Sequence, residues 1–133
     1  MAILQSHIDT SAAWFDENRR DMLEQISIIQ DLHDEAAAGG GQIAMDRMRS
    51  REKMPIRERI SLVLDPDSPF LEISSLAGYC SKYSVGGGLV MGIGVINGVE
   101  CMIEGNDPTV LGGAITSFAG RKIMRAIQIA REK

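Results

Sequence analysis

The spacing of apolar residues predicts one long helix, which runs from Asp9 or Thr10 to Ala38. An oxygen of Asp9, Thr10 or Ser11 can accept backbone N–H groups at its start. Three glycines follow its end, where glycine adopts a left-handed turn without steric cost. The apolar positions recur at helical spacing at Phe15, Met22, Ile26, Ile29 and His33. A stripe of this length on a small domain favours packing against a partner subunit or a larger body.

The next segment is basic and favours helix. Residues 42–53 carry four bases, which are Arg47, Arg49, Arg51 and Lys53. A second helix is predicted from Pro55, because the fixed φ of proline suits the first position of a helix. This helix is expected to end at Asp65, which is followed by another proline.

Alternation of apolar residues with a period of two predicts the strands. Residues 70–74 form a short predicted strand, and residues 89–95 and 99–103 form two longer ones. Asn97 and Gly98 lie between the two longer runs. This dipeptide is typical of a tight hairpin turn, since both turn positions need a positive φ.

A final helix is predicted from about Ala114 to Arg131. Its expected buried face comprises Ile115, Phe118 or Ala119, Ile123, Ile127 and Ala130. Its bases are expected away from that face, and they are Arg121, Lys122, Arg125 and Arg131.

Gly112 and Gly113 come immediately before this predicted helix. Their backbone N–H groups are expected to lie uncovered at the positive end of the helix dipole. Such groups can hold a thioester carbonyl, an enolate or a phosphate oxygen. The alternative is a tight turn whose glycines only permit close packing.

The glycines between residues 86 and 94 do not form a dinucleotide-binding fingerprint. Asn97 stands where that fingerprint requires glycine, and a hairpin follows in place of a helix. These glycines are expected to let a strand pass close to other backbone. No pairing of a nucleophile with a base is apparent around His7 or His33. Any chemistry is therefore expected to use backbone dipoles or residues outside this sequence.

Composition and charge narrow the classes of partner. The 133 residues, 44% of them hydrophobic, suit one domain with a core, and the net charge of −4 argues against a dedicated nucleic-acid binder. Bases gather in residues 41–60 and 105–133, which suits an anionic small molecule. Cys80 and Cys101 match neither a metal spacing nor a disulfide framework. No membrane-length apolar run or secretory pattern is visible, so a cytoplasmic location without a membrane partner is expected.

Three blocks of the sequence resemble the carboxyltransferase beta subunits of biotin-dependent acyl-CoA carboxylases. The blocks are PIRERISLVLDPDSPFLEIS, GGGLVMGIGVINGVECMIEGNDPTVLGGA and KIMRAIQIARE. They occur in the same order as in that family, and the likeness spans about residues 45–132. Residues 1–44 share only their helical and charged character with the N-terminus of the family.

The resemblance implies an α/β fold of the crotonase-like (ClpP/crotonase) type, built from β-β-α units and preceded by N-terminal helices. Residues 1–44 would be a helical extension, and residues 45–133 the incomplete start of the acyl-CoA carboxyltransferase N-terminal domain. The complete protein would transfer a carboxyl group from carboxybiotin to an acyl-CoA. Biotin would be carried on a separate subunit or domain and not be bound directly by this chain. The implied partners are acyl-CoA, a biotin carboxylase or biotin carrier subunit, and further carboxyltransferase subunits.

The candidate CoA-binding residues are Arg57, Arg59, Gly112 and Gly113. For the two arginines, the alternative is that one of them pairs with a nearby acid, either a neighbour of Glu58 or Asp65, and ties the helix down. Leu111 stands where many relatives have lysine, so no phosphate-directed side chain is expected there. The oxyanion-hole glycines of the family lie one strand beyond the final helix. No catalytic residue is therefore assigned, and the chain alone is expected to be inactive.

Two other functions fit the same resemblance. One is an acyl-CoA decarboxylase subunit with the same fold. The other is a non-catalytic remnant that pairs with another carboxylase subunit.

Overall fold

The computed structural model describes residues 6–132, which fall into two compact units. The first unit extends to Asp31 and contains most of helix α1 (Ala13–Ala38). The second unit begins at Leu32 and contains the end of α1 and all the other elements. None of the helices in the described part of the chain is long and apolar enough to cross a membrane.

Helix α1 confirms the predicted long helix, but it begins at Ala13, a few residues later than expected. Before it, the carboxylate of Asp9 accepts hydrogen bonds from the backbone N–H and the hydroxyl of Ser11, at 2.9 and 2.6 Å. These hydrogen bonds close a local turn, so the carboxylate of Asp9 is occupied before the helix starts. No residue of α1 is buried, and Met22 on its apolar stripe is 62% exposed. Within its own unit, the apolar face of α1 is therefore exposed.

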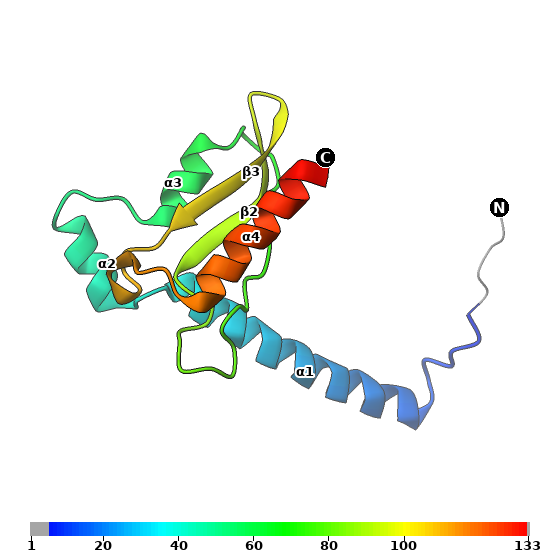
Figure 1. The fold of residues 1–133 in the computed structure, drawn as a ribbon. Helices are drawn as coiled ribbons and strands as arrows, with labels where there is room; N and C mark the ends of the chain where they lie inside the picture. Colours follow the sequence, from blue (N-terminus) through cyan, green and yellow to red (C-terminus); the bar gives the residue numbers. More distant parts are fainter. Residues whose placement is uncertain (1–5, 133) are drawn as a thin grey trace. The chain divides into compact units, whose positions relative to one another are not determined.

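The second unit is built on an antiparallel sheet with strand order β1-β2-β3. Figure 1 shows its two long strands, β2 and β3. The strands are β1 (Leu71–Glu72), β2 (Leu89–Ile96) and β3 (Val99–Asn106). Strand β2 is central, and β3 forms one edge of the sheet.

The predicted hairpin between β2 and β3 is confirmed. Asn97 and Gly98 connect the strands with φ values of 51° and 76°. The carboxylate of Asp65 accepts hydrogen bonds from the N–H groups of both residues, each at 2.7 Å. This turn needs a positive φ at two positions. It is also held by the side chain of Asp65, which lies 32 residues before Asn97.

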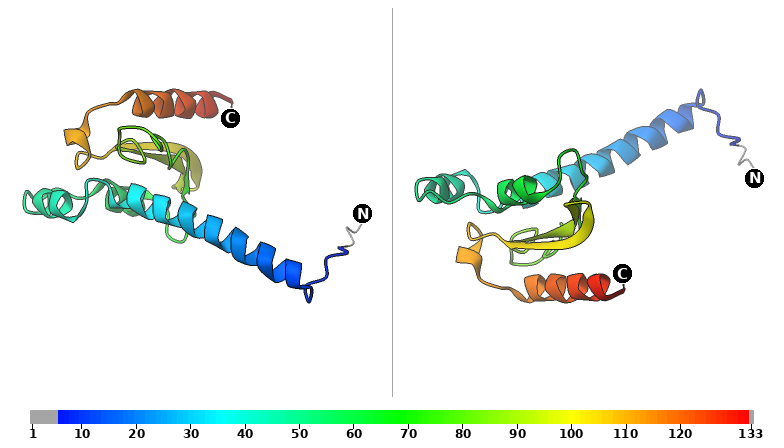
Figure 2. Two further views of the ribbon diagram at one scale, coloured as in Figure 1. Left: turned by 90° about the horizontal axis from the view of Figure 1, so that it is seen from below. Right: turned by 90° about the horizontal axis from the view of Figure 1, so that it is seen from above.

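Helices cover both faces of the sheet, so β2 is buried on both sides (Figure 2). Helix α2 (Gln42–Arg49) leads to α3 (Ile56–Val63), which starts after Pro55 as predicted. On one face of the sheet, Ile56 and Ile60 of α3 form an apolar cluster with Val90 of β2.

Helix α4 (Ser117–Glu132) covers the opposite face, where Ala119 and Ala126 cluster with Leu89 and Met91 of β2. The prediction of a final helix is confirmed, but the helix begins at Ser117 and not at Ala114. Small alanines face the sheet, which lets the backbone of α4 lie close to β2.

The predicted buried face of α4 was wrong at its edges. Ile115 and Ile127 are 66% and 42% exposed, whereas Lys122 is only 2% exposed. Lys122 lies three residues after Ala119 and four before Ala126, so it shares their face of the helix. Its charged end finds acceptors inside the molecule, as described below.

The glycines of β2 make the close approach of β1 and Phe70 possible. A Cβ atom on Gly92 would lie 2.5 Å from the carbonyl oxygen of Leu71 and 2.5 Å from the ring of Phe70. A real Cβ atom almost never approaches so closely. The expectation that these glycines permit close approach of backbone is confirmed at Gly92.

Replacing Gly92 with alanine should lower the free energy of unfolding by about 2 kcal/mol, because the new methyl group has no space between β1 and Phe70. The matched control is Gly120→Ala in α4, where a Cβ atom would meet nothing. That change should raise stability by up to about 1 kcal/mol, because alanine favours helix more than glycine does. Denaturant unfolding followed by circular dichroism measures both, and equal effects would contradict the packing argument.

Candidate functional site

Two adjoining cavities form a basic groove beside the end of α2. Their volumes are about 300 and 540 Å³, and both are lined by Met48, Lys53 and Pro108. The other lining residues are Ala44, Arg47, Arg51, Met54, Arg59, Thr109 and Gly112. The lining thus includes four cationic side chains and no carboxylate among the residues that the structure describes. Such a groove attracts anions.

The turn after α2 brings the bases of the groove together. The N–H groups of Arg51 and Lys53 both donate to the carbonyl oxygen of Met48, at 3.1 and 3.2 Å. Glu52 adopts a positive φ of 57° between them, which lets the chain reverse. Arg49 instead forms an ion pair with Glu58 and does not line the groove.

The opposite wall of the groove is fixed by a buried acid. Asp107 is 6% exposed, and its carboxylate accepts hydrogen bonds from the N–H and the hydroxyl of Thr109, at 2.9 and 2.5 Å. The hydroxyl oxygen of Thr109 in turn accepts the N–H of Gly40 at 3.0 Å. The wall at Pro108 and Thr109 is therefore tied to the end of α1.

Gly112 and Gly113 are not at the start of a long helix, so that expectation was wrong. They belong to the short 3₁₀ turn η1 (Leu111–Gly113), and α4 begins only at Ser117. The N–H of Gly113 donates to the carbonyl of Val110 at 2.9 Å. Gly112 is exposed, has a φ of 64° and lines the groove. Of the two glycines, Gly112 is the one that faces the basic groove.

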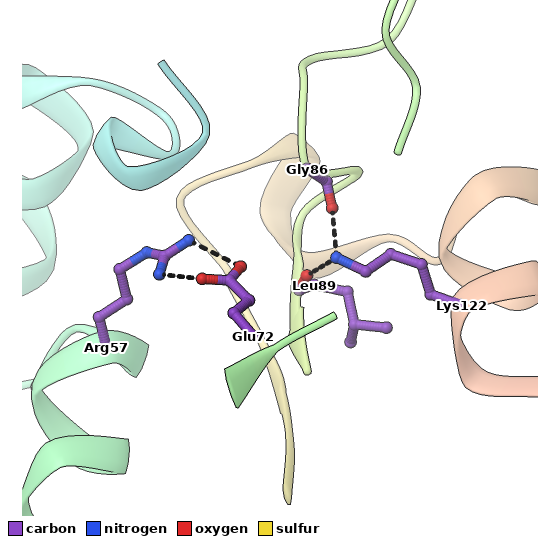
Figure 3. Close-up of polar contacts among 5 residues, drawn as sticks. All are labelled: Arg57, Glu72, Gly86, Leu89 and Lys122. Carbon is purple, nitrogen blue, oxygen red and sulfur yellow. Dashed lines mark hydrogen bonds and ion pairs between the residues drawn. The ribbon is translucent and has the colours of Figure 1, made fainter. Parts of the chain in front are cut away.

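Arg57 and Arg59 lie in different surroundings. Arg59 is exposed and lines the groove. Arg57 forms a two-pronged ion pair with Glu72 of β1, at 2.6 and 3.0 Å (Figure 3). The two side chains of this pair are 34% and 20% exposed. The alternative of an ion pair is confirmed for Arg57, although its partner is Glu72 and not Asp65 or a neighbour of Glu58. The assignment of all four candidate residues to CoA stays a prediction.

Lys122 approaches the same region from the other side of the sheet (Figure 3). Its Nζ donates to the carbonyl oxygen of Gly86 at 3.1 Å and to that of Leu89. Burial lowers the pKa of Lys122 to about 8, although the carboxylate of Glu72 acts to raise it. Lys122 thereby binds the glycine loop (residues 86–88), which leads into β2.

Metal binding and disulfide formation are two further possibilities in the described part of the chain. No group of three or more His, Cys, Asp and Glu residues that could hold a metal is found there. Cys80 is exposed and Cys101 is half-buried, and both thiols are free.

Comparison with known proteins identifies the family of this chain. The sequence profile of the carboxyl transferase domain matches residues 47–133. A probable biotin-dependent acyl-coenzyme A carboxylase beta2 subunit from Mycobacterium tuberculosis is 48% identical over 130 residues. That alignment covers 98% of this chain and 25% of the relative.

Two solved structures resemble the fold of this chain. The beta subunit of geranyl-CoA carboxylase from P. aeruginosa has a TM-score of 0.85 and 38% identity, and the match covers 97% of this chain and 24% of that one. Transcarboxylase 12S has a TM-score of 0.73 and 25% identity, and the match covers 82% of this chain and 22% of that one. The predicted α/β, crotonase-like fold is confirmed by these neighbours. The chain spans about a quarter of the length of the relatives that it matches.

The domain boundary between residues 44 and 45 stays a prediction. The family profile begins at residue 47, whereas the second compact unit begins at Leu32. The end of α1 therefore packs with the unit that carries the groove.

The Arg57–Glu72 pair should stabilise the fold. Arg57→Gln leaves a half-buried carboxylate without its partner and should lower the free energy of unfolding by about 1 to 3 kcal/mol. Arg59→Gln, in the same helix but exposed, should change it by less than about 0.5 kcal/mol. Thermal and denaturant unfolding of both variants measures the difference. Equal stabilities would show that the pair does not contribute to stability.

Lys122 should make the stability depend on pH. In the unfolded chain its pKa returns to about 10.5, so between pH 8 and 10 the unfolded chain binds more protons than the folded one. The free energy of unfolding should therefore rise over this range. The rise should be smaller in Lys122→Met and preserved in Lys82→Met, since Lys82 is exposed. Denaturant unfolding at pH 7.5, 9 and 10 tests this, and identical slopes in both variants would contradict it.

Proposed function

Because the chain belongs to the carboxyl transferase domain family, we propose that it forms part of the carboxyltransferase subunit of a biotin-dependent acyl-CoA carboxylase. The complete subunit transfers a carboxyl group from carboxybiotin to an acyl-CoA. Two relatives support this proposal by their names. The M. tuberculosis protein is a probable acyl-CoA carboxylase beta2 subunit, and the P. aeruginosa protein is a geranyl-CoA carboxylase beta subunit. Within the subunit, this chain contributes the side that holds the acyl-CoA.

The single observation that carries the proposal is the basic groove. CoA carries a diphosphate and a ribose phosphate, so a binding site for it needs several cations on one surface. Arg51 and Arg59 can each fork onto a phosphate with paired hydrogen bonds, and Lys53 adds a point charge between them. The exposed backbone of Gly112 lets a phosphate approach without obstruction by a side chain. Met48 and Met54 add apolar surface for the adenine.

The reaction places few demands on side chains in this part of the subunit. Carboxyl transfer to the α-carbon of a thioester passes through an enolate, which needs hydrogen-bond donors at its oxygen. The groove residues instead bind parts of CoA that do not react, and they therefore contribute to substrate affinity and positioning. Biotin supplies the transferred carboxyl group, and none of the described residues is assigned to it.

The partners of the complete subunit follow from the same proposal. A biotin-carrying subunit or domain must deliver carboxybiotin. The solved transcarboxylase 12S is described as a hexamer, which supports assembly of the complete subunit with copies of itself.

The groove should bind CoA even without the rest of the subunit. Titration calorimetry with CoA and with dephospho-CoA tests this in the 133-residue chain. CoA should bind more tightly, and its affinity should fall steeply with salt, because several phosphate contacts are screened. The double variant Arg51→Gln/Lys53→Gln should weaken CoA binding about tenfold or more.

The matched control is Arg125→Gln, which removes an exposed positive charge from α4, away from the groove. It should leave the affinity for CoA within about twofold. Absence of CoA binding at millimolar concentration, or equal losses in the groove and control variants, would contradict the proposed role of the groove.

A hybrid enzyme separates the two arginines. This chain can replace the aligned segment of the P. aeruginosa geranyl-CoA carboxylase beta subunit, which it matches with 38% identity. Arg59→Gln in the hybrid should raise the KM for the acyl-CoA about tenfold with kcat nearly unchanged, since it removes binding shared by ground state and transition state. Arg57→Gln should lower the melting temperature and leave KM nearly unchanged. A normal KM in Arg59→Gln would remove Arg59 from the site.

A further inference from the structure

Helix α2 carries part of the basic groove but has few buried contacts of its own. All eight of its residues are described, and Met48 is the only buried one. One side of α2 lines a cavity of about 320 Å³ at Gln42 and Met45, and another side lines the groove at Ala44 and Arg47. A segment with so few buried apolar contacts shifts easily unless its ends are fixed.

The C-terminal end of α2 is held weakly. Arg49 forms an ion pair with Glu58, but the two side chains are 61% and 50% exposed. Ion pairs so accessible to water contribute little to stability. The position of α2 therefore depends on the buried Met48 and on the N-terminal end of the helix.

The N-terminal end of α2 is joined to the turn that follows β3. Gly41 caps the helix, and the N–H of Gly40 before it donates to the hydroxyl oxygen of Thr109 at 3.0 Å. That hydroxyl donates to the carboxylate of the buried Asp107 at 2.5 Å, and the N–H of Thr109 donates to the same oxygen at 2.9 Å. One carboxylate therefore holds both walls of the groove. It holds the wall at Pro108 and Thr109 directly, and it holds α2 through the hydroxyl of Thr109.

Two glycines let the backbone before α2 meet the opposite wall without a side chain between them. A Cβ atom on Gly39 would lie 2.4 Å from the carboxylate of Asp107, and one on Gly40 would lie 2.1 Å from the carbonyl oxygen of Thr109. Real Cβ atoms almost never come so close. The backbone before α2 is therefore packed directly on the turn after β3, and this contact defines one separation of the walls.

We propose that Asp107 and Thr109 are positioning residues, which set the distance between the two walls of the groove and thereby the spacing of its bases. The N–H groups of Arg51 and Lys53 donate to the carbonyl oxygen of Met48, so these bases move with α2. Asp107 does not line the groove. The hydroxyl of Thr109 has a single proton, which Asp107 accepts, so none is left to donate to a phosphate. The two residues therefore act on the bases and not on CoA itself.

This inference rests on the proposed function, because it concerns the phosphates of CoA. Several phosphates can be bound at once only if the bases that bind them are held at a suitable spacing. A loosely held α2 should therefore lower the affinity for CoA. It should also reduce the advantage of CoA over dephospho-CoA, which has one phosphate fewer.

A pair of variants at Thr109 tests the proposal in the 133-residue chain. Thr109→Val removes the hydroxyl with little change in shape, and Thr109→Ser keeps it. Titration calorimetry should show that Thr109→Val weakens CoA binding about fivefold, which corresponds to one ordinary hydrogen bond. The affinity of this variant for CoA should also lie closer to its affinity for dephospho-CoA. Thr109→Ser should bind CoA within about twofold of the wild type, because its hydrogen bonds are kept.

Hydrogen exchange reports the anchoring of α2 directly. The N–H groups of Ala44 and Met45 donate to the carbonyl oxygen of Gly41 in the first turn of the helix, both at 3.1 Å. In Thr109→Val, exchange of these two amides should accelerate by a larger factor than exchange of the amides of β2, since the opening is local. In Thr109→Ser, both rates should remain as in the wild type.

Two further variants separate positioning from stability. Gly40→Ala removes no polar group but places a methyl group against the carbonyl oxygen of Thr109, so it should also weaken CoA binding. Thr116→Val makes the same chemical change as Thr109→Val at the start of α4, away from the groove, where it removes the acceptor for the N–H of Ala119. It should lower the melting temperature, because a helix cap is lost, and leave the affinity for CoA within about twofold of the wild type.

The outcomes distinguish the proposal from the function on which it rests. An affinity for CoA in Thr109→Val equal to that of the wild type, or an equal loss in Thr116→Val, overturns the proposal. Unchanged exchange at Ala44 and Met45 in Thr109→Val overturns it as well. If the wild-type chain itself does not bind CoA, the proposed function fails, and faster exchange in Thr109→Val alone still supports the hold of Asp107 and Thr109 on α2.

Discussion

The fold depends on packing helices against both faces of strand β2. Side chains alternate between the two faces of a strand, so successive residues of β2 must fit against different helices. On the α4 side, Leu89 and Met91 supply bulk, and alanines of the helix receive it. On the α3 side, Gly92 and Gly94 supply none, and the ring of Phe70 and the side chain of Leu64 fill that space. The strand therefore has one face of large residues and one with little side-chain volume.

Such tight packing leaves little water near the polar groups at the ends of the strands, so the protein must satisfy them itself. Lys122 does this for the carbonyl groups of Gly86 and Leu89, where the glycine loop enters β2. Glu72 of β1 is paired with Arg57 on the other side of the sheet. These contacts connect α3, β1, the glycine loop and α4 (Figure 3). Arg59 of the groove lies on α3, so this part of the groove is carried by an anchored helix, as a binding site requires.

The sequence predicted those features whose causes are local. The hairpin followed from Asn97 and Gly98, because a tight turn is decided by the residues that form it. The buried face of α4 was predicted incorrectly at Lys122, since a buried lysine is tolerated only where acceptors are available. Those acceptors lie 33 and 36 residues earlier in the chain. The spacing of Lys122 from Ala119 and Ala126 was the one signal that could have revealed it.

The edge strand β3 has a consequence for the specificity of strand pairing. It is eight residues long, and among the residues that the structure describes it has a neighbour on one side only, so its other side presents unpaired backbone groups. Glu100 and Glu104 are exposed along it. Two copies that met edge to edge in antiparallel fashion would place these carboxylates near one another, which is unfavourable. Like charges along this edge therefore disfavour pairing of β3 with a second copy of itself.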